Sequence, residues 1–183
     1  LDAYPFSPRY GWVQDRFGTT WQLILTDPAG DPRPFIMPSL LFADHTTNRA
    51  EEAIHFYLSV FEDSEVGMLV PYPEGSEPNQ PGSLMFGDFQ LGGLWFTASD
   101  SGIEHGFTFN EAVSLSVTCR DQAEIDHYWE KLSSDPQAEQ CGWCKDKYGV
   151  SWQIIPENIE ELMEKPEAFT HMMAMKKIVI ADF

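Results

Sequence analysis

The chain has 183 residues and a formal net charge of −18 at neutral pH, with 11 Lys and Arg against 29 Asp and Glu. This acidity disfavours binding to nucleic acids and to anionic membrane surfaces, because both partners are themselves negatively charged. No apolar stretch approaches the roughly 18 residues of a transmembrane helix, so no membrane partner is expected, and an odd number of cysteines, three, favours a reducing cytoplasm.

The first feature in chain order is a sequence segment that occurs twice in similar form. Residues 11–24 read GWVQDRFGTTWQLI and residues 142–155 read GWCKDKYGVSWQII, so the copies begin 131 positions apart (142 − 11). A repeat with such a long period indicates a duplicated structural unit. The sequence therefore predicts that residues 1–25 are the terminal strand pair of a preceding domain, similar to the one that ends with the second copy.

Residues 26–34 are rich in Pro, Gly and Asp, a composition that is typical of a linker. A complete domain made of two similar halves is predicted over residues 35–156. Residues 157–183 should form a C-terminal helical tail, which Pro166 must interrupt because proline cannot continue a helix.

The first half of the predicted domain begins with a strand at residues 39–43. A helix should follow, with Asn48 as its N-cap. Apolar runs then predict strands at residues 66–70, 83–91 and 94–97, and a Gly-Gly pair joins the last two as a hairpin.

The second half repeats this order. Residues 112–118 alternate between apolar and polar side chains, as a half-buried strand does. Asp121 is the predicted cap of a second helix, and strands are expected at residues 140–145 and 150–155. The resulting fold class is α+β, with helices packed outside a curved sheet.

Several short motifs extend this pattern along residues 35–183: Ala50-Glu51-Glu52-Ala53, Phe56-Tyr57, Pro81-Gly82-Ser83, the run from Phe107 to Ala112, Tyr128-Trp129-Glu130-Lys131-Leu132, Cys141-Gly142-Trp143 and the run from Ala174 to Ile178. They resemble the vicinal-oxygen-chelate superfamily, which includes glyoxalase I, bleomycin-resistance proteins and extradiol dioxygenases. Within it, the chain is similar to the PhnB-like group, often labelled 3-demethylubiquinone-9 3-methyltransferase. The resemblance implies paired βαβββ modules that form a cupped mixed sheet with the helices outside.

The same resemblance directs attention to a metal site. Superfamily members usually hold a divalent metal inside the cup, with His, Glu or Gln from the first and last strands of each module. Here those strands offer Ser39, Leu40, Leu41, Trp95, Thr97, Ser114, Ser116, Ser151 and Gln153. Only Gln153 could donate an amide oxygen, whereas a stable site needs several matched ligands. The sequence therefore predicts no metal and no cofactor.

A cup with aromatic walls then becomes the expected binding site for a small molecule. The residues predicted to line it are Trp95, Phe107, Phe109, Trp143, Trp152 and Gln153. The acid–base candidates are His105, in the connection between the halves, and His45, in the loop before the first helix.

The leading hypothesis is a small-molecule-binding protein of the PhnB-like group without an assigned activity. The alternative is a metal-dependent lyase, isomerase or transferase of the same superfamily, including the methyltransferase of the label. A methyl donor usually needs a glycine-rich turn after a parallel strand, and Gly92-Gly93 falls in a hairpin instead. The apolar strand pair at residues 10–25 predicts pairing with a sheet edge, either in this domain or in a second copy of the chain, and a homodimer with strand exchange is the favoured arrangement.

Overall fold

The computed structural model describes residues 1–4 and 7–183 and divides the chain into two compact units, Leu1–Ile36 and Met37–Phe183. Residues 5 and 6, which belong to the predicted strand-pair segment 1–25, lie outside the described residues. The origin of that segment in a preceding domain stays a prediction. In the described part of the chain, every helix is too short or too polar to cross a membrane.

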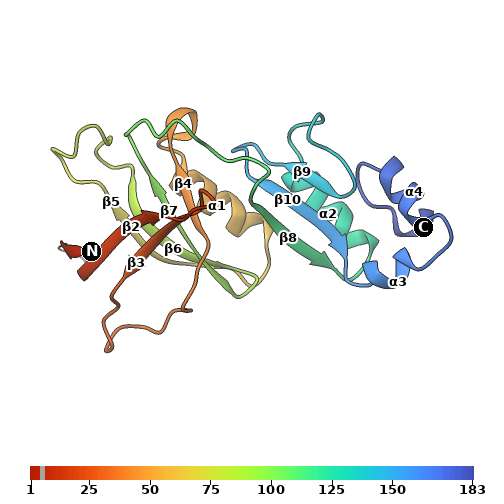
Figure 1. The fold of residues 1–183 in the computed structure, drawn as a ribbon, viewed down its shortest axis with the longest axis horizontal. Coiled ribbons are helices and arrows are strands. Elements are labelled where there is room, and N and C mark those ends of the chain that lie inside the picture. The colour runs from red at the N-terminus through yellow and green to blue at the C-terminus, as the bar shows by residue number, and fades with distance from the viewer. Residues whose placement is uncertain (5–6) are drawn as a thin grey trace. The chain divides into compact units, whose positions relative to one another are not determined.

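The first unit is a three-stranded antiparallel sheet in the order β1 (Asp2–Tyr4), β2 (Ser7–Gln14) and β3 (Thr20–Ile24) (Figure 1). Strands β2 and β3 form the hairpin that the first copy of the repeat predicts. In its register Val13 lies opposite Trp21, so these two side chains point to the same face.

The second unit begins with a four-stranded sheet in the order β4 (Ser39–Phe42), β7 (Leu94–Asp100), β6 (Leu84–Leu91) and β5 (Glu65–Pro71). Strands β4 and β7 are parallel, and the other neighbours are antiparallel. Helix α1 (Ala50–Val60) packs along one face of this sheet (Figure 1). Its buried side chains recur at helical spacing, and they include Ala53, Ile54 and Tyr57.

A three-stranded sheet follows, in the order β8 (Ser114–Cys119), β10 (Ser151–Pro156) and β9 (Trp143–Lys145), with α2 (Gln122–Leu132) on one face. Strand β10 is parallel to β8 and antiparallel to β9. The α+β class and the strand–helix–strand order of both halves are confirmed. The predicted strand at 140–145 is shorter than expected, because Gln140 forms only an isolated bridge with Trp143.

The C-terminal tail contains the short helices α3 (Ile159–Met163) and α4 (Ala168–Ala174), which are separated around Pro166 as expected. Two short 3-10 turns, at Asp44–Thr46 and Ile180–Asp182, complete the secondary structure of the described residues. The tail belongs to the folded unit, since the Ile178 side chain in it is fully buried in the core.

The two predicted helix caps have different outcomes. Asp121 does cap α2, because its Oδ1 accepts a hydrogen bond from the backbone N–H of Glu124 at 3.0 Å. The prediction for Asn48 is wrong: Arg49 occupies the N-cap position of α1 and its side chain makes no capping hydrogen bond. Asn48 has a φ of 67° and lies before the helix.

The cap of α1 comes from the end of β7. The buried carboxylate of Asp100 accepts hydrogen bonds at Oδ1 from the backbone N–H groups of Arg49, at 3.0 Å, and Ala50, at 3.1 Å. Its Oδ2 accepts a third from the N–H of Leu84, at 2.9 Å. One carboxylate therefore fixes the start of α1 relative to β6 and β7. Burial raises the pKa of Asp100 in spite of these hydrogen bonds.

A second buried carboxylate, Asp146, connects the two halves. Its Oδ1 accepts the backbone N–H groups of Tyr148, at 2.9 Å, and Val150, at 3.0 Å, which closes the turn between β9 and β10. Its Oδ2 accepts the hydroxyl of Tyr57 on α1, at 2.7 Å, and the indole Nε1–H of Trp152 on β10, at 2.9 Å. Burial raises the pKa of Asp146, and these hydrogen bonds oppose that rise.

Aromatic rings surround this carboxylate. The Trp152 ring lies 5.5 Å from the Tyr57 ring and 5.4 Å from the Phe61 ring, centroid to centroid. Tyr148 contacts Tyr57 and Phe42 at 6.0 and 5.9 Å. The core between the halves is therefore an aromatic cluster around a hydrogen-bonded charge.

We expect Tyr57→Phe to lower the free energy of unfolding by about 2 kcal/mol, because a hydrogen bond to a charged group contributes roughly 1.5–3 kcal/mol. Urea denaturation measures this loss as a lower midpoint with an unchanged slope. The matched control is Tyr148→Phe, which removes a phenol bound to the half-exposed Glu52 and should cost clearly less. Equal losses in the two variants would contradict the assignment.

Glu52 gives a prediction about pH. Hydrogen bonds from Arg49 and Tyr148 lower its pKa from 4.5 to about 2. Because the folded-state pKa lies below the unfolded one, ionised Glu52 stabilises the fold above about pH 4.5, and this stabilisation is lost as the pH falls toward 2. As the pH falls from about 4.5 toward 2, the free energy of unfolding of Glu52→Gln should therefore decrease less than that of the unchanged protein. Urea titrations at each pH measure both values. The exposed control Glu130→Gln should follow the unchanged protein.

Candidate functional site

The sheet β8–β10–β9 has one face against the core and one face turned away from it. On the core side, Cys144, Trp152 and Ile154 are at most 2% exposed. Successive side chains of a strand point to opposite faces, so Trp143 and Gln153 lie on the other side. The open face of the second sheet is defined here by Ser114, Ser116, Trp143, Lys145 and Gln153, all of them partly or fully exposed.

An aromatic ring and hydrogen-bonding groups meet on this open face. Gln153 lies directly opposite Trp143 on β9 and directly opposite Ser116 on β8. The side-chain Nε2 of Gln153 donates a hydrogen bond to Ser114 Oγ at 2.7 Å, which orients the amide. An indole beside an oriented amide and two hydroxyls can hold an organic molecule that has a flat apolar part and polar substituents.

Charge at the edge of the open face is balanced. The ammonium group of Lys145 lies 2.5 Å from the carboxylate of Glu111, which belongs to the connection between the halves. The hydrogen bond from Lys145 lowers the pKa of Glu111. A ligand on this face would therefore meet an ion pair rather than an isolated positive charge.

Two buried hydroxyls have no hydrogen-bond partner among the described residues: Ser151 Oγ and Thr108 Oγ1. Ser151 pairs in register with Lys145 and Ser114, so its side chain points to the same side of the sheet as the open face. Thr108 is in the connection between the halves, and its neighbour Phe109 lies beside Gly149 in the turn before β10. Buried hydroxyls normally find a partner, so both mark places where a hydrogen bond could still form.

Trp152 lies apart from the other predicted ligand residues. It is 2% exposed, its indole nitrogen donates to Asp146, and its ring packs on Tyr57 of α1 and on Phe61, which follows that helix. It therefore belongs to the core side of the sheet, opposite to Trp143 and Gln153. The sequence could have shown this, because successive side chains of a strand alternate between faces, so residues 152 and 153 cannot point to the same face.

The three remaining aromatic candidates are distributed over the domain. Trp95 is in the other sheet, on β7 opposite Gln90, and its ring lies over the backbone of Gly67. Phe109 packs edge-on against the buried ring of Phe42, with centroids 5.1 Å apart. Phe107 is 45% exposed. The open face of the second sheet thus brings together Trp143 and Gln153 from the predicted set.

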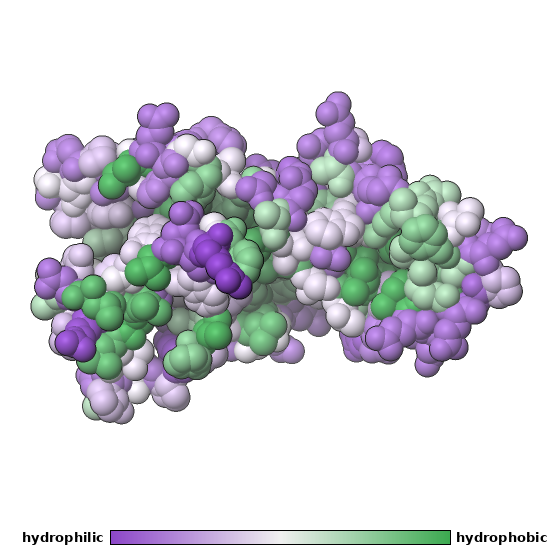
Figure 2. Space-filling view, in the orientation of Figure 1, coloured by the Kyte–Doolittle hydropathy of each residue, from purple (hydrophilic) through white to green (hydrophobic). Residues whose placement is uncertain are grey.

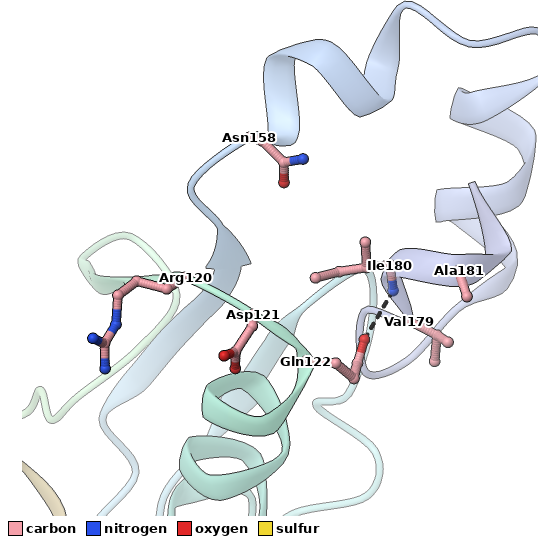
Figure 3. Close-up of a pocket in the computed structure, with 7 residues that line it drawn as sticks. All are labelled: Arg120, Asp121, Gln122, Asn158, Val179, Ile180 and Ala181. Carbon is pink, nitrogen blue, oxygen red and sulfur yellow. Dashed lines mark hydrogen bonds between the residues drawn. The ribbon is translucent and has the colours of Figure 1, made fainter.

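A surface pocket lies elsewhere, at the start of α2. It has a volume of about 480 Å³ and is lined by Arg120, Asp121, Gln122, Asn158, Val179, Ile180 and Ala181 (Figure 3). Gln122 Oε1 accepts the backbone N–H of Ile180 at 2.9 Å, and Gln122 Nε2 donates to the carbonyl of Ile178 at 3.1 Å. These bonds fasten the C-terminal tail to α2, so the cavity is a junction of the tail with the domain.

The two histidine candidates come from the turn after β4 and from the connection between the halves, and a hydrogen bond joins these two segments. His105 Nε2 is 2.8 Å from Ser101 Oγ, and the backbone N–H of His105 donates to Asp44 Oδ1 at 3.2 Å. Asp44 precedes the exposed His45 in the 3-10 turn after β4. A Ser–His pair can exchange a proton with a bound molecule. Sequence reasoning missed Asp44, because only the parallel pairing of β4 and β7 brings it to the loop of His105. It also missed Ser101, which lies four positions before His105 and was therefore within reach of a local reading of the sequence.

The donor atoms present do not fit the divalent metal that the fold implies. Among residues 1–4 and 7–183, no group of three or more His, Cys, Asp or Glu is placed to hold an ion. The relevant strands carry hydroxyl, indole and amide groups, whereas a divalent site needs several imidazole or carboxylate ligands. The buried Asp88, opposite Thr97 on β7, is a carboxylate that sequence reasoning missed, and its Oδ1 is engaged by the backbone N–H of Met68.

Comparison with known proteins adds the family. The profile of the family described as 3-demethylubiquinone-9 3-methyltransferase matches residues 34–155. A solved structure from Bacillus cereus, a putative 3-demethylubiquinone-9 3-methyltransferase, PhnB protein, is 38% identical, with a TM-score of 0.58 over 67% of this chain and 99% of its own. A protein from Staphylococcus aureus is 29% identical over 68% of this chain and 97% of its own, with a TM-score of 0.32. No curated protein matches the chain.

The strand–helix–strand halves and these matches define a member of the vicinal-oxygen-chelate superfamily, whose glyoxalase/bleomycin-resistance fold this chain has. Within that superfamily, the chain belongs to the 3-demethylubiquinone-9 3-methyltransferase family and is PhnB-like. The resemblance found in the sequence is therefore confirmed.

The assignment of faces can be tested by truncation. Trp152→Ala should lower the free energy of unfolding by about 3–5 kcal/mol, because it opens a cavity in the core. Trp143→Ala should cost less than half as much, because this side chain lies on the open face. Urea denaturation of the two variants measures the difference. Similar losses would mean that both indoles are structural.

Proposed function

We propose that this chain binds a small organic molecule on the open face of the second sheet. In this proposal the Trp143 ring stacks on a flat or apolar part of the ligand, and Gln153 and Ser116 form hydrogen bonds with it. The observation that supports it most directly is the register, which aligns Trp143, Gln153 and Ser116 across three neighbouring strands.

The surroundings of these residues favour a binding site over a random surface. The opposite face of the same strands is packed into the core, so the backbone beneath the ligand groups is rigid. An indole provides a large contact area at little cost in side-chain entropy. Trp95, Phe107 and Phe109 are proposed as further walls of the cup. Trp152 is left out of the proposal because it is 2% exposed.

A reaction is less well supported than binding. The metal-dependent lyase or isomerase alternative needs several metal ligands, and the strand positions supply only an amide and hydroxyls. The methyl transfer that the name of the Bacillus cereus protein implies usually requires a glycine-rich turn after a parallel strand. In this chain Ala43 and Asp44 follow the parallel strand β4, and Arg120 and Asp121 follow β8. We therefore propose binding without a metal.

The expected assembly and location remain predictions. The sequence-based expectation for the apolar strand pair near residues 10–25 is a homodimer with strand exchange, and the cysteine count predicts a cytoplasmic location. Sedimentation velocity of the purified protein measures the first directly, because a dimer doubles the mass of 20.8 kDa.

Native mass spectrometry of the protein as isolated, before and after denaturation, tests the proposed binding. We expect an organic mass on the unchanged protein, without a stoichiometric divalent ion. Trp143→Ala should reduce the occupied fraction at a given ligand concentration, with an affinity about tenfold lower, which corresponds to about 1.4 kcal/mol. The ligand released from the unchanged protein serves as the probe for the variant.

Leu94→Ala is the control, since Leu94 is 68% exposed in the β6–β7 hairpin and lies outside the proposed site. Its occupancy should equal that of the unchanged protein. A bound Zn, Ni, Mn or Fe ion would contradict the metal-free proposal and support the enzyme alternative. Undiminished binding by Trp143→Ala would contradict the placement of the site.

A further inference from the structure

The two copies of the repeated hairpin share one hydrogen-bond arrangement. In the first copy, Asp15 Oδ1 accepts the backbone N–H groups of Phe17, at 2.9 Å, and Thr19, at 3.0 Å. Its Oδ2 accepts the indole N–H of Trp21 at 3.1 Å. Asp146 holds the corresponding three groups of the second copy at 2.9, 3.0 and 2.9 Å. The two hairpins are therefore the same structural part.

The copies differ in what covers them. In the second copy a fourth donor, the Tyr57 hydroxyl of α1, reaches the aspartate, and the Tyr57 and Phe61 rings cover the indole. There Trp152 is 2% exposed. In the first copy the corresponding Trp21 is 41% exposed, and among the described residues no tyrosine hydroxyl donates to Asp15.

The exposure extends over a whole face of the first hairpin. Val13, Phe17 and Leu23 are 48, 78 and 46% exposed. The corresponding residues of the second copy, Cys144, Tyr148 and Ile154, are 1, 2 and 0% exposed. Figure 2 shows apolar side chains gathered on the surface over β2 and β3. We call Val13, Phe17, Trp21 and Leu23 the exposed hairpin face, and a patch of this kind marks an interaction surface.

One edge of the first hairpin also differs. In the second copy, β10 pairs on both sides, antiparallel with β9 and parallel with β8. In the first unit, β3 pairs with β2 and, among the described residues, with no other strand. The first copy therefore lacks, in these residues, both the parallel strand and the helices that complete the second copy.

We propose that the exposed hairpin face and the β3 edge bind a polypeptide segment that has the same order of strands and helices as residues 37–131 of this chain. A strand of that segment pairs in parallel with β3, as β8 does with β10. Its first helix covers Trp21 and brings a tyrosine hydroxyl to Asp15, as Tyr57 does to Asp146. This inference concerns the hairpin and is independent of the proposed ligand site.

A second copy of this chain is a poorer occupant than such a segment. Its own helix α1 already donates the Tyr57 hydroxyl to Asp146 and packs Phe61 on Trp152. If that helix covered the hairpin of another protomer instead, an equally apolar hairpin would lose its cover. Exchange between copies therefore buries no additional surface of this type, whereas a separate segment does.

The repeat defines the experiment, because Leu132 lies 131 positions after Leu1, the same offset as the two hairpins. An extra copy of residues 37–131 is fused directly before Leu1 of the full chain. The first hairpin then follows the extra copy at the same distance at which the second hairpin follows residues 37–131 in the unextended chain. Backbone amide exchange is followed by mass spectrometry in peptides from residues 10–24, whose sequence distinguishes them from 141–155. We expect exchange in β3 to slow by at least about tenfold relative to the unextended chain.

In the matched control, residues 37–156 precede Leu1. The added segment then contains a hairpin of its own, and its helix covers that hairpin instead of residues 10–24. Exchange in residues 10–24 should then stay as fast as in the unextended chain. Unchanged exchange in the first extended chain overturns the proposal, whether or not the added segment folds. Equal protection by both extensions overturns it as well. Protection in the unextended chain that disappears together with a dimer on dilution would assign the surface to a second copy instead.

Discussion

The buried carboxylate of Asp146 accepts donors from three places in the sequence, and the arrangement of the second unit depends on it. Its two oxygens bind two amides of the turn between β9 and β10, the indole of Trp152 and the phenol of Tyr57. A buried charge is tolerated only when it is hydrogen-bonded on all sides. The carboxylate therefore requires the turn, the strand and α1 together, which orients the sheet and decides which of its faces stays open.

The sequence predicts regular elements well, because their signals are local. The hairpin within each copy of the repeat, the alternation in 112–118 and the Asp121 cap all involve residues that are close together in the sequence, and each is found in the structure. The Asn48 cap fails because the capping carboxylate, Asp100, comes from another strand. For the same reason, the hydrogen bond between Asp44 and the backbone of His105 and the buried position of Ser151 become apparent only when the strands are paired.

The candidate site was predictable in part. Trp143 and Gln153 lie on one face because a two-stranded pairing puts them opposite each other. Trp152 was predicted with them because it is aromatic, but it is a core residue. The alternation of side chains along β10 places it on the face opposite to Gln153. The family match ends at residue 155, where the second copy of the repeat ends, and leaves the first copy outside. The family thus accounts for residues 34–155, and the first hairpin has to be understood from its similarity to the second.

The long-range cap on α1 has a consequence for how the chain acquires structure during synthesis. The first amides of this 11-residue helix are satisfied by Asp100, 50 and 51 positions later in the chain. An isolated helix of this length is marginal in water, so α1 gains its cap only after residue 100 has left the ribosome. The first half of the second unit then forms as one body, once the last of its strands is present, instead of one element after another.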